Sequence, residues 1–204
     1  MFNVECLING MKKFIVALSM VLVAMSGWSQ TYFEPAAKDV YSPTKLQKNV
    51  ATSTDIAALA LPVATLAGVL IQQDWKGLIQ GVETAGATAA ATFILKYAVN
   101  ERRPDGSDMH SFPSGHTAVS FATAAFLQRR YGWAFGGPAY ALATYVAWGR
   151  VFSKKHHWWD VVAGGAIGAG SAYIFTKPFA KKHNLQLAPV SDGRNFGIYA
   201  SMEF

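Results

Sequence analysis

The sequence contains little cysteine and little charge. Cys6 is the only thiol among 204 residues. A single cysteine excludes a disulfide framework and any zinc or iron–sulfur site built from cysteines. Charged residues make up 15% of the chain, whereas hydrophobic residues make up 51% and aromatic residues 13%. A disordered, solvating chain has the opposite balance, so this composition predicts one packed domain of ordinary size.

The formal net charge of +6 favours anionic partners such as phosphate esters and acidic lipids. Nucleic acid is not expected as a partner, because the charge is modest and the aromatic residues are not interleaved with a basic face. The mean hydropathy of +0.18 is high for a soluble enzyme and low for a polytopic membrane protein. Composition therefore leaves open whether the domain is embedded in a membrane or peripheral to it.

The first 29 residues predict an export signal. A basic start at residues 11–13 precedes an eleven-residue apolar core from Phe14 to Ala24, and small residues at 25–29 suit cleavage. Met11 is an alternative start, which would make residues 1–10 an upstream extension. The apolar core is short for a membrane span of about 20 residues, so a cleaved signal is favoured over a retained anchor. We expect the mature chain on the periplasmic side, where a protein without cysteine suits the oxidising compartment.

The rest of the chain divides into a polar lead-in at 30–49, a helical domain at 50–180 and a C-terminal tail at 184–204. Five apolar segments of the domain are longer than strands and rich in alanine and leucine, which predicts helices. They are residues 56–73, the stretch between Gly77 and Leu95, and residues 117–128, 138–148 and 161–176. The predicted fold is an all-α bundle of about five helices, with a sixth if the signal segment is retained.

Local patterns add detail to this fold. Gly136-Gly137-Pro138 predicts a turn. The small residues at 163–170 predict a helix that crosses a neighbour closely, in lipid or in a tight bundle. Apolar residues alternate with others from Phe196 to Phe204, which predicts a strand of a short β-hairpin.

Polar residues gather in three groups, each where an apolar segment begins or ends. The first group is Lys96 and Arg103, seven residues apart and so expected on one helical face. Ser114 and Gly115 stand before His116 at a predicted helix start, where free N–H groups bind anions. The third group runs from Arg150 through His156 to Asp160, and the last two are four apart, on one face of a helix.

Each group alone is more typical of a solvated helix end, a helix cap or a surface hydrogen bond. Their ordered combination is not explained in this way, because ten positions with a specified residue type are very unlikely to occur together by chance. The order is Lys96 with Arg103-Pro104, then Pro113-Ser114-Gly115-His116, then Arg150, His156 and Asp160. Over residues 96 to about 170 the chain resembles the type 2 phosphatidic acid phosphatase family, which is related to class A bacterial acid phosphatases and vanadium haloperoxidases.

The resemblance implies a metal-independent phosphatase that needs no cofactor. His156 would be the nucleophile, held by Asp160, and His116 would be the acid and then the base. The phosphate would be bound by three cations and a helix start: Lys96, Arg103, Arg150, Ser114 and Gly115. The family usually has serine directly before the third-motif arginine, whereas this chain has Gly149, so one hydroxyl contact is missing.

Several other polar residues are interpreted as ordinary surface or packing groups. Asp105, Asp108 and His110 lie in a loop without the spacing of a metal site. His157 is expected to neighbour Trp158. The basic pairs Arg129-Arg130 and Lys154-Lys155 are expected to be solvated or to face lipid headgroups.

The favoured function is hydrolysis of a phosphomonoester or diphosphate through a phosphohistidine, with a membrane lipid as the favoured substrate. Three alternatives stay open: a soluble periplasmic acid phosphatase for small phosphomonoesters, a vanadate-dependent peroxidase, and a non-catalytic membrane-associated protein. The sequence makes no prediction about the oligomeric state.

Overall fold

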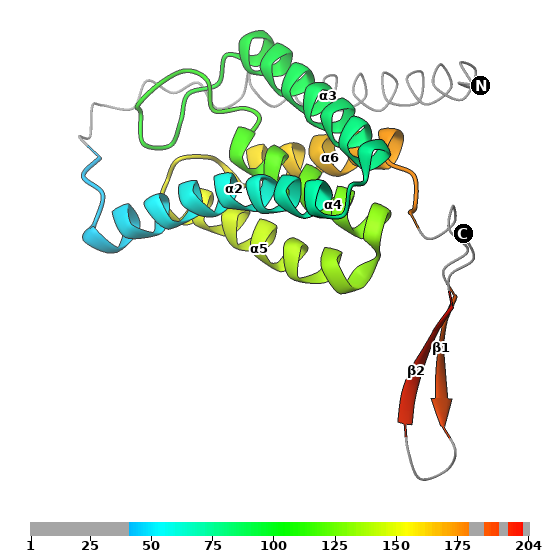
Figure 1. The fold of residues 1–204 in the computed structure, drawn as a ribbon. Coiled ribbons are helices and arrows are strands. Elements are labelled where there is room, and N and C mark those ends of the chain that lie inside the picture. The colour runs from blue at the N-terminus through cyan, green and yellow to red at the C-terminus, as the bar shows by residue number, and fades with distance from the viewer. Residues whose placement is uncertain (1–40, 180–185, 192–195, 202–204) are drawn as a thin grey trace.

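Within the part of the chain that the structure describes, five helices form the body of the protein (Figure 1). The computed structural model describes residues 41–179, 186–191 and 196–201, so the predicted signal segment lies outside the described residues. The helices are α2 (Lys45–Ile71), α3 (Trp75–Val99), α4 (Gly115–Tyr131), α5 (Trp133–Phe152) and α6 (Trp158–Phe175). The predicted all-α bundle of about five helices is confirmed.

Helix α4 is the centre of the bundle and packs against the other four helices. Figure 1 shows α3 on one side of the α4–α6 pair and α5 on the other. The side chains that fill the centre are mostly small, and Ala118, Ala124 and Ala143 are completely buried. Small residues let helix backbones approach closely, so this core is stabilised largely by contacts between the helices themselves.

The closest approach is between α4 and α6, as the small residues at 163–170 predict. A Cβ at Gly164 would lie 2.5 Å from the carbonyl oxygen of Ser114, and one at Gly168 would lie 2.1 Å from that of Ala118. No real side chain fits at such distances from a main chain. The two glycines therefore set the spacing between α4 and α6.

Two helix boundaries differ from the sequence prediction. Helix α2 begins at Lys45, inside the predicted lead-in, because Thr44 and Gln47 form a reciprocal capping box. The predicted turn at Gly136-Gly137-Pro138 is wrong. The chain turns earlier, at Gly132 with φ of 90°, and Pro138 lies in the second turn of α5.

Large apolar side chains cover the outer faces of α2 and α3. Leu59, Ile71 and Ile79 are each more than half exposed, as are Val82, Phe93 and Ile94. Helices α2 and α3 are each long and apolar enough to cross a membrane, judged by length and composition. Exposed apolar surface of this extent marks a surface that contacts something other than water.

At the end of the bundle where α2 meets α3, Arg130, which was predicted to be solvated, forms a buried ion pair. Arg130 is 4% exposed, and its Nε donates to Asp74 at 2.7 Å. Asp74 also accepts from the hydroxyl of Tyr131 at 2.8 Å and caps α3 through the N–H of Gly77. The prediction for Arg130 is wrong because a carboxylate from a distant turn satisfies its charge, which sequence spacing does not reveal.

After the helical body, two strands pair in antiparallel fashion. They are β1 (Gln186–Ser191) and β2 (Phe196–Ser201), with Gln186 opposite Ser201 and Ser191 opposite Phe196. The residues that connect them, 192–195, lie outside the described residues.

Candidate active site

Two loops at one end of the bundle, together with the helix ends that flank them, carry the residues that the sequence singles out. The α3–α4 loop and the α5–α6 loop lie at the same end, on the left of Figure 1. Helix α3 ends at Val99 because Asn100 adopts the left-handed conformation, with φ of 53°. Arg103 therefore lies in the loop. The prediction from spacing that it shares a helical face with Lys96 is wrong.

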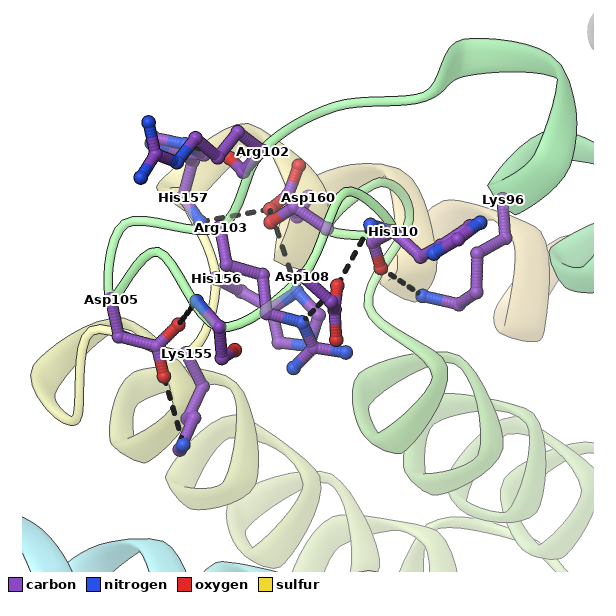
Figure 2. A network of polar contacts seen from close by, with 12 residues as sticks. Lys96, Arg102, Arg103, Asp105, Asp108, His110, Lys155, His156, His157 and Asp160 are labelled. Atoms are coloured by element: carbon purple, nitrogen blue, oxygen red, sulfur yellow. Dashed lines mark hydrogen bonds and ion pairs between the residues drawn. The ribbon is translucent and has the colours of Figure 1, made fainter.

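His156 lies in the loop before α6, and Asp160 lies in the first turn of that helix. Nδ1 of His156 is 3.4 Å from Oδ2 of Asp160, and both side chains are almost completely buried. The predicted pairing is thus present, although it does not arise from one helical face. His157 is the N-cap, and its backbone N–H donates to Oδ2 of Asp160 at 2.9 Å, which aims the carboxylate back at the loop (Figure 2).

Asp160 is held as a carboxylate by several donors. The hydroxyl of Ser111 donates to Oδ2 at 2.5 Å, in addition to the backbone N–H of His157. Burial opposes ionisation, but the contact with His156 and the hydrogen bonds from Ser111 and His157 hold the pKa of Asp160 below its ordinary value. A fixed negative charge therefore faces Nδ1 of His156, which favours a proton on that nitrogen and leaves Nε2 with a free electron pair.

The electrostatics of His156 are those of a neutral imidazole. Burial lowers the pKa of His156, and the positive charges of Arg103 and Arg150 lower it further, against the opposing effect of Asp160. A neutral imidazole that becomes cationic only when it forms a bond is a suitable nucleophile.

His116, in the first turn of α4, is the second imidazole of the site. Burial lowers the pKa of His116 to about 4, helped by the positive charge of Arg150 and opposed by the carboxylate of Asp55. Nε2 of His116 lies 3.1 Å from Oδ1 of Asp55. With no anion bound, His116 is therefore neutral at pH 7.

The three predicted cations reach the site from three elements. Arg103 comes from the α3–α4 loop, where its Nε donates to Asp108 at 2.8 Å (Figure 2). Arg150 comes from the last turn of α5 and is 5% exposed. The charges of both arginines act on both imidazoles, so these four groups lie near one another.

Lys96 contributes a positive charge to the site and also holds the α3–α4 loop in place. Its Nζ donates to the carbonyl oxygens of His110 at 2.7 Å and Pro113 at 3.1 Å. These bonds attach the last turn of α3 to the segment that enters α4. Lys96 therefore helps to position Ser114 and His116, a role that the sequence pattern does not indicate.

Ser114 is the N-cap of α4 and Gly115 is its first residue, as predicted. The hydroxyl of Ser114 lies 3.0 Å from that of Thr117, and within the described part of the chain it makes no side-chain cap hydrogen bond. Its backbone N–H donates to the carbonyl oxygen of Asp160 at 3.0 Å, which joins α4 to α6. The first-turn N–H groups of α4 thus face the site without a side-chain cap, as an anion site requires.

The structure gives a physical reason for glycine at position 149. A Cβ there would lie 2.4 Å from Cγ2 of Thr54 and 3.1 Å from Cγ1 of Val50. Thr54 is completely buried between α2 and α5. In this chain a threonine from α2 fills the space beside Arg150 that a serine would need.

Sequence reasoning missed three acidic or polar groups. Asp55 contacts His116 and Arg150, and Ser111 donates to Asp160. Glu101 accepts from Nε1 of Trp159 at 2.8 Å, and burial next to the charge of Asp160 raises the pKa of Glu101 to about 7. Only Asp55 carried a signal in the sequence, because it is the one ionisable residue between Lys48 and Asp74.

The two aspartates of the α3–α4 loop, which the sequence pattern did not indicate as metal ligands, are paired with cations. Asp105 binds Lys155 at 2.8 Å, which corrects the expectation that Lys155 is merely solvated, and Asp108 binds Arg103. No group of three or more His, Cys, Asp or Glu side chains that could hold a metal ion occurs within the ranges that the structure describes. The ring of His157 stacks on Trp159 with a centroid distance of 4.4 Å, so its neighbour is Trp159 and not Trp158 as expected.

Comparison with known families identifies the superfamily of the chain. The family model described as the PAP2 superfamily matches residues 77–183, just over half of the chain. The chain belongs to the PAP2 superfamily. The matched range holds all eight residues that the sequence singles out, whereas Asp55 lies outside it.

Curated relatives of this PAP2 chain include two bacterial lipid A phosphatases. A lipid A 1-phosphatase from Porphyromonas gingivalis is 36% identical over 77 residues, which are 36% of this chain and 17% of that protein. A lipid A 4'-phosphatase from Helicobacter pylori is 29% identical over 133 residues, covering 60% of this chain and 67% of that protein. The chain thus spans about a sixth of the first relative and two thirds of the second.

Two solved structures share the fold. One is Aquifex aeolicus LpxE, with 19% identity and a TM-score of 0.51 over 67% of this chain and 96% of that one. The other is a transmembrane PAP2 type phosphatidylglycerolphosphate phosphatase from Bacillus subtilis, with 20% identity and a TM-score of 0.53 over 83% of this chain and 93% of that one.

Proposed function

We propose that this PAP2 protein is a phosphatase that hydrolyses a phosphate ester of a membrane lipid through a phosphohistidine, without a metal ion. The observation that carries the proposal is a buried, neutral His156 with Asp160 at Nδ1 and the charges of Arg103 and Arg150 acting on it. A nucleophilic imidazole beside fixed cations is suited to attack phosphorus, because the cations bind the phosphate oxygens while the imidazole bonds to the phosphorus.

In the first step, Nε2 of His156 forms a bond to phosphorus as the bond from phosphorus to the ester oxygen breaks. His116 donates a proton to that oxygen, so the lipid leaves as an alcohol. The carboxylate of Asp160, 3.4 Å from Nδ1, stabilises the positive charge that develops on the imidazole.

In the second step, His116 accepts a proton from water, and the water oxygen bonds to phosphorus as the bond to Nε2 breaks. Inorganic phosphate is the second product. Lys96, Arg103 and Arg150, with the first-turn N–H groups after Ser114 and Gly115, bind the oxygens that carry the charge in both steps. The two guanidinium groups form paired hydrogen bonds that a single ammonium does not.

A membrane lipid is the substrate class that the surface favours. The apolar outer faces of α2 and α3 suit contact with hydrocarbon, and they lead up to the end of the bundle that holds the site. The two curated relatives described above are phosphatases of lipid A, a phosphorylated lipid. We propose membrane association with the site on the periplasmic side, where the predicted export signal would direct it.

The deciding experiment compares hydrolysis of a micellar lipid phosphate with that of a short soluble ester, in detergent with chelator present. We expect faster turnover of the lipid, phosphate in acid-labile linkage on the protein during turnover, and loss of both in His156→Ala. His110→Gln is the matched control, because His110 is only partly buried and its hydrogen bonds to Lys96 and Asp108 are made by its backbone. Activity in His156→Ala, or its loss with chelator, would contradict the mechanism, and preference for the soluble ester would contradict the lipid substrate.

A further inference from the structure

Asp55 is an unusual residue for its surroundings. It lies on α2 and is the one ionisable residue between Lys48 and Asp74, in a helix apolar enough to cross a membrane. An acidic side chain in such a helix is unfavourable unless it has a function and a partner. None of the three sequence motifs includes it.

One oxygen of Asp55 holds two groups of the site. Oδ1 lies 3.1 Å from Nε2 of His116 and forms an ion pair with a terminal nitrogen of Arg150. Under the proposed function these are the atoms that bind the substrate's phosphate and protonate its leaving oxygen. A phosphate oxygen that contacts both would have to occupy the position of Oδ1.

The two partners differ in how freely they move. The side chain of Asp55 is 51% exposed, whereas that of Arg150 is 6% exposed. Arg150 is therefore fixed, while the carboxylate can turn outward into water. A buried guanidinium without a partner is strongly unfavourable, so an exchangeable carboxylate is a suitable partner while no anion is bound.

We infer that Asp55 is an internal competitor for the phosphate site: its carboxylate neutralises Arg150 and holds His116 in the free enzyme, and substrate phosphate displaces it. A carboxylate and a phosphate anion on the same donors repel each other, so the two cannot be bound together. The same competition weakens the binding of inorganic phosphate after hydrolysis. Asp55 therefore limits product inhibition as well as substrate affinity.

The test is Asp55→Asn, which keeps the shape of the side chain and removes its charge. We expect the inhibition constants of inorganic phosphate and orthovanadate, and the KM, to fall by roughly tenfold, a Coulomb effect of one charge near a half-exposed anion. Because kcat then includes slower phosphate release, it should not rise. Glu83→Gln is the matched control, since it removes the same charge from α3, away from the site, and should leave these constants unchanged.

This inference rests on the proposed function, and the assay separates the two. If the wild-type protein hydrolyses no phosphate ester, the proposed function fails. If it does, unchanged or weaker phosphate inhibition in Asp55→Asn overturns the competitor role, and weaker inhibition would mean that Asp55 positions His116 and Arg150 for the substrate. Asp55→Ala, with direct calorimetric binding of orthovanadate and a melting temperature for each variant, keeps the test valid if the asparagine variant folds poorly.

Discussion

Replacing Gly149 by serine tests the contact between α2 and α5 beside the site. The new Cβ would lie 2.4 Å from Cγ2 of Thr54, whose branched side chain has few alternative rotamers on a helix. Overpacking of this kind costs about 1–3 kcal/mol, and the better helix propensity of serine returns about 0.5 kcal/mol. We expect Gly149→Ser to lower the free energy of unfolding by about 1–2 kcal/mol, which is about 2–8 °C in Tm for a chain of this size.

The same substitution should lower kcat/KM, because its neighbours are site residues. Gly149 directly precedes Arg150, so relief of the clash with Thr54 displaces the guanidinium that is proposed to bind the phosphate. Thr54→Ala removes the obstructing methyl group and costs about 1 kcal/mol by itself. In the Gly149→Ser background it should be neutral or stabilising, which makes the two substitutions strongly non-additive.

Thermal unfolding in detergent and hydrolysis of the lipid phosphate measure the two effects. Gly137→Ser is the matched control on the same helix, because a Cβ at Gly137 meets nothing within 4 Å. Full stability of Gly149→Ser would refute the reasoning. So would an equal effect of Thr54→Ala with glycine and with serine at position 149.

Three further predictions concern packing, pH and the buried ion pair. Gly168→Ala should destabilise the protein by about 2 kcal/mol or more in thermal unfolding, because the new Cβ meets the main chain of α4. Gly170→Ala is the control and should not destabilise it, because a Cβ there meets nothing within 4 Å. Equal Tm values for the two variants would contradict the close crossing of α4 and α6. With a His116 pKa of about 4 in the free enzyme, the proton for the leaving oxygen enters with the substrate. We therefore expect kcat/KM to fall above the second pKa of the phosphate ester, which is about 6. A more acidic ester should shift this fall in the pH profile to lower pH, and a profile that does not shift would contradict the reasoning. Although burial opposes it, hydrogen bonds led by Arg130 hold the pKa of Asp74 below its ordinary value, so the pair contributes stability above about pH 4 that is lost as the pH falls through the lowered pKa. Asp74→Asn should lower the free energy of unfolding by about 3–5 kcal/mol at pH 7 and remove this loss of stability in acid. Denaturant unfolding of both proteins at pH 7 and pH 3 measures the two effects.

The sequence by itself determined the helical fold and the candidate residues of the site. Long apolar segments rich in alanine can satisfy their backbone groups only as packed helices, and the glycines at 164 and 168 required a close helix crossing. The order of Lys96, Arg103, His116, Arg150, His156 and Asp160 identified the family because chemistry restricts those positions whatever the packing. These inferences depend on local pattern, which the chain carries without its tertiary contacts.

Tertiary structure alone decided which side chains meet. Asp55 joins His116 and Arg150, Thr54 fills the space beside Gly149, and Arg130 is buried against Asp74, although none of these partners is near in sequence. Contacts of this kind depend on the spacing and rotation of whole helices, to which every core side chain contributes. Local spacing also misplaced Arg103 and His156 on helices, because helix ends are set by caps such as Asn100 and His157 and by the loops they lead into.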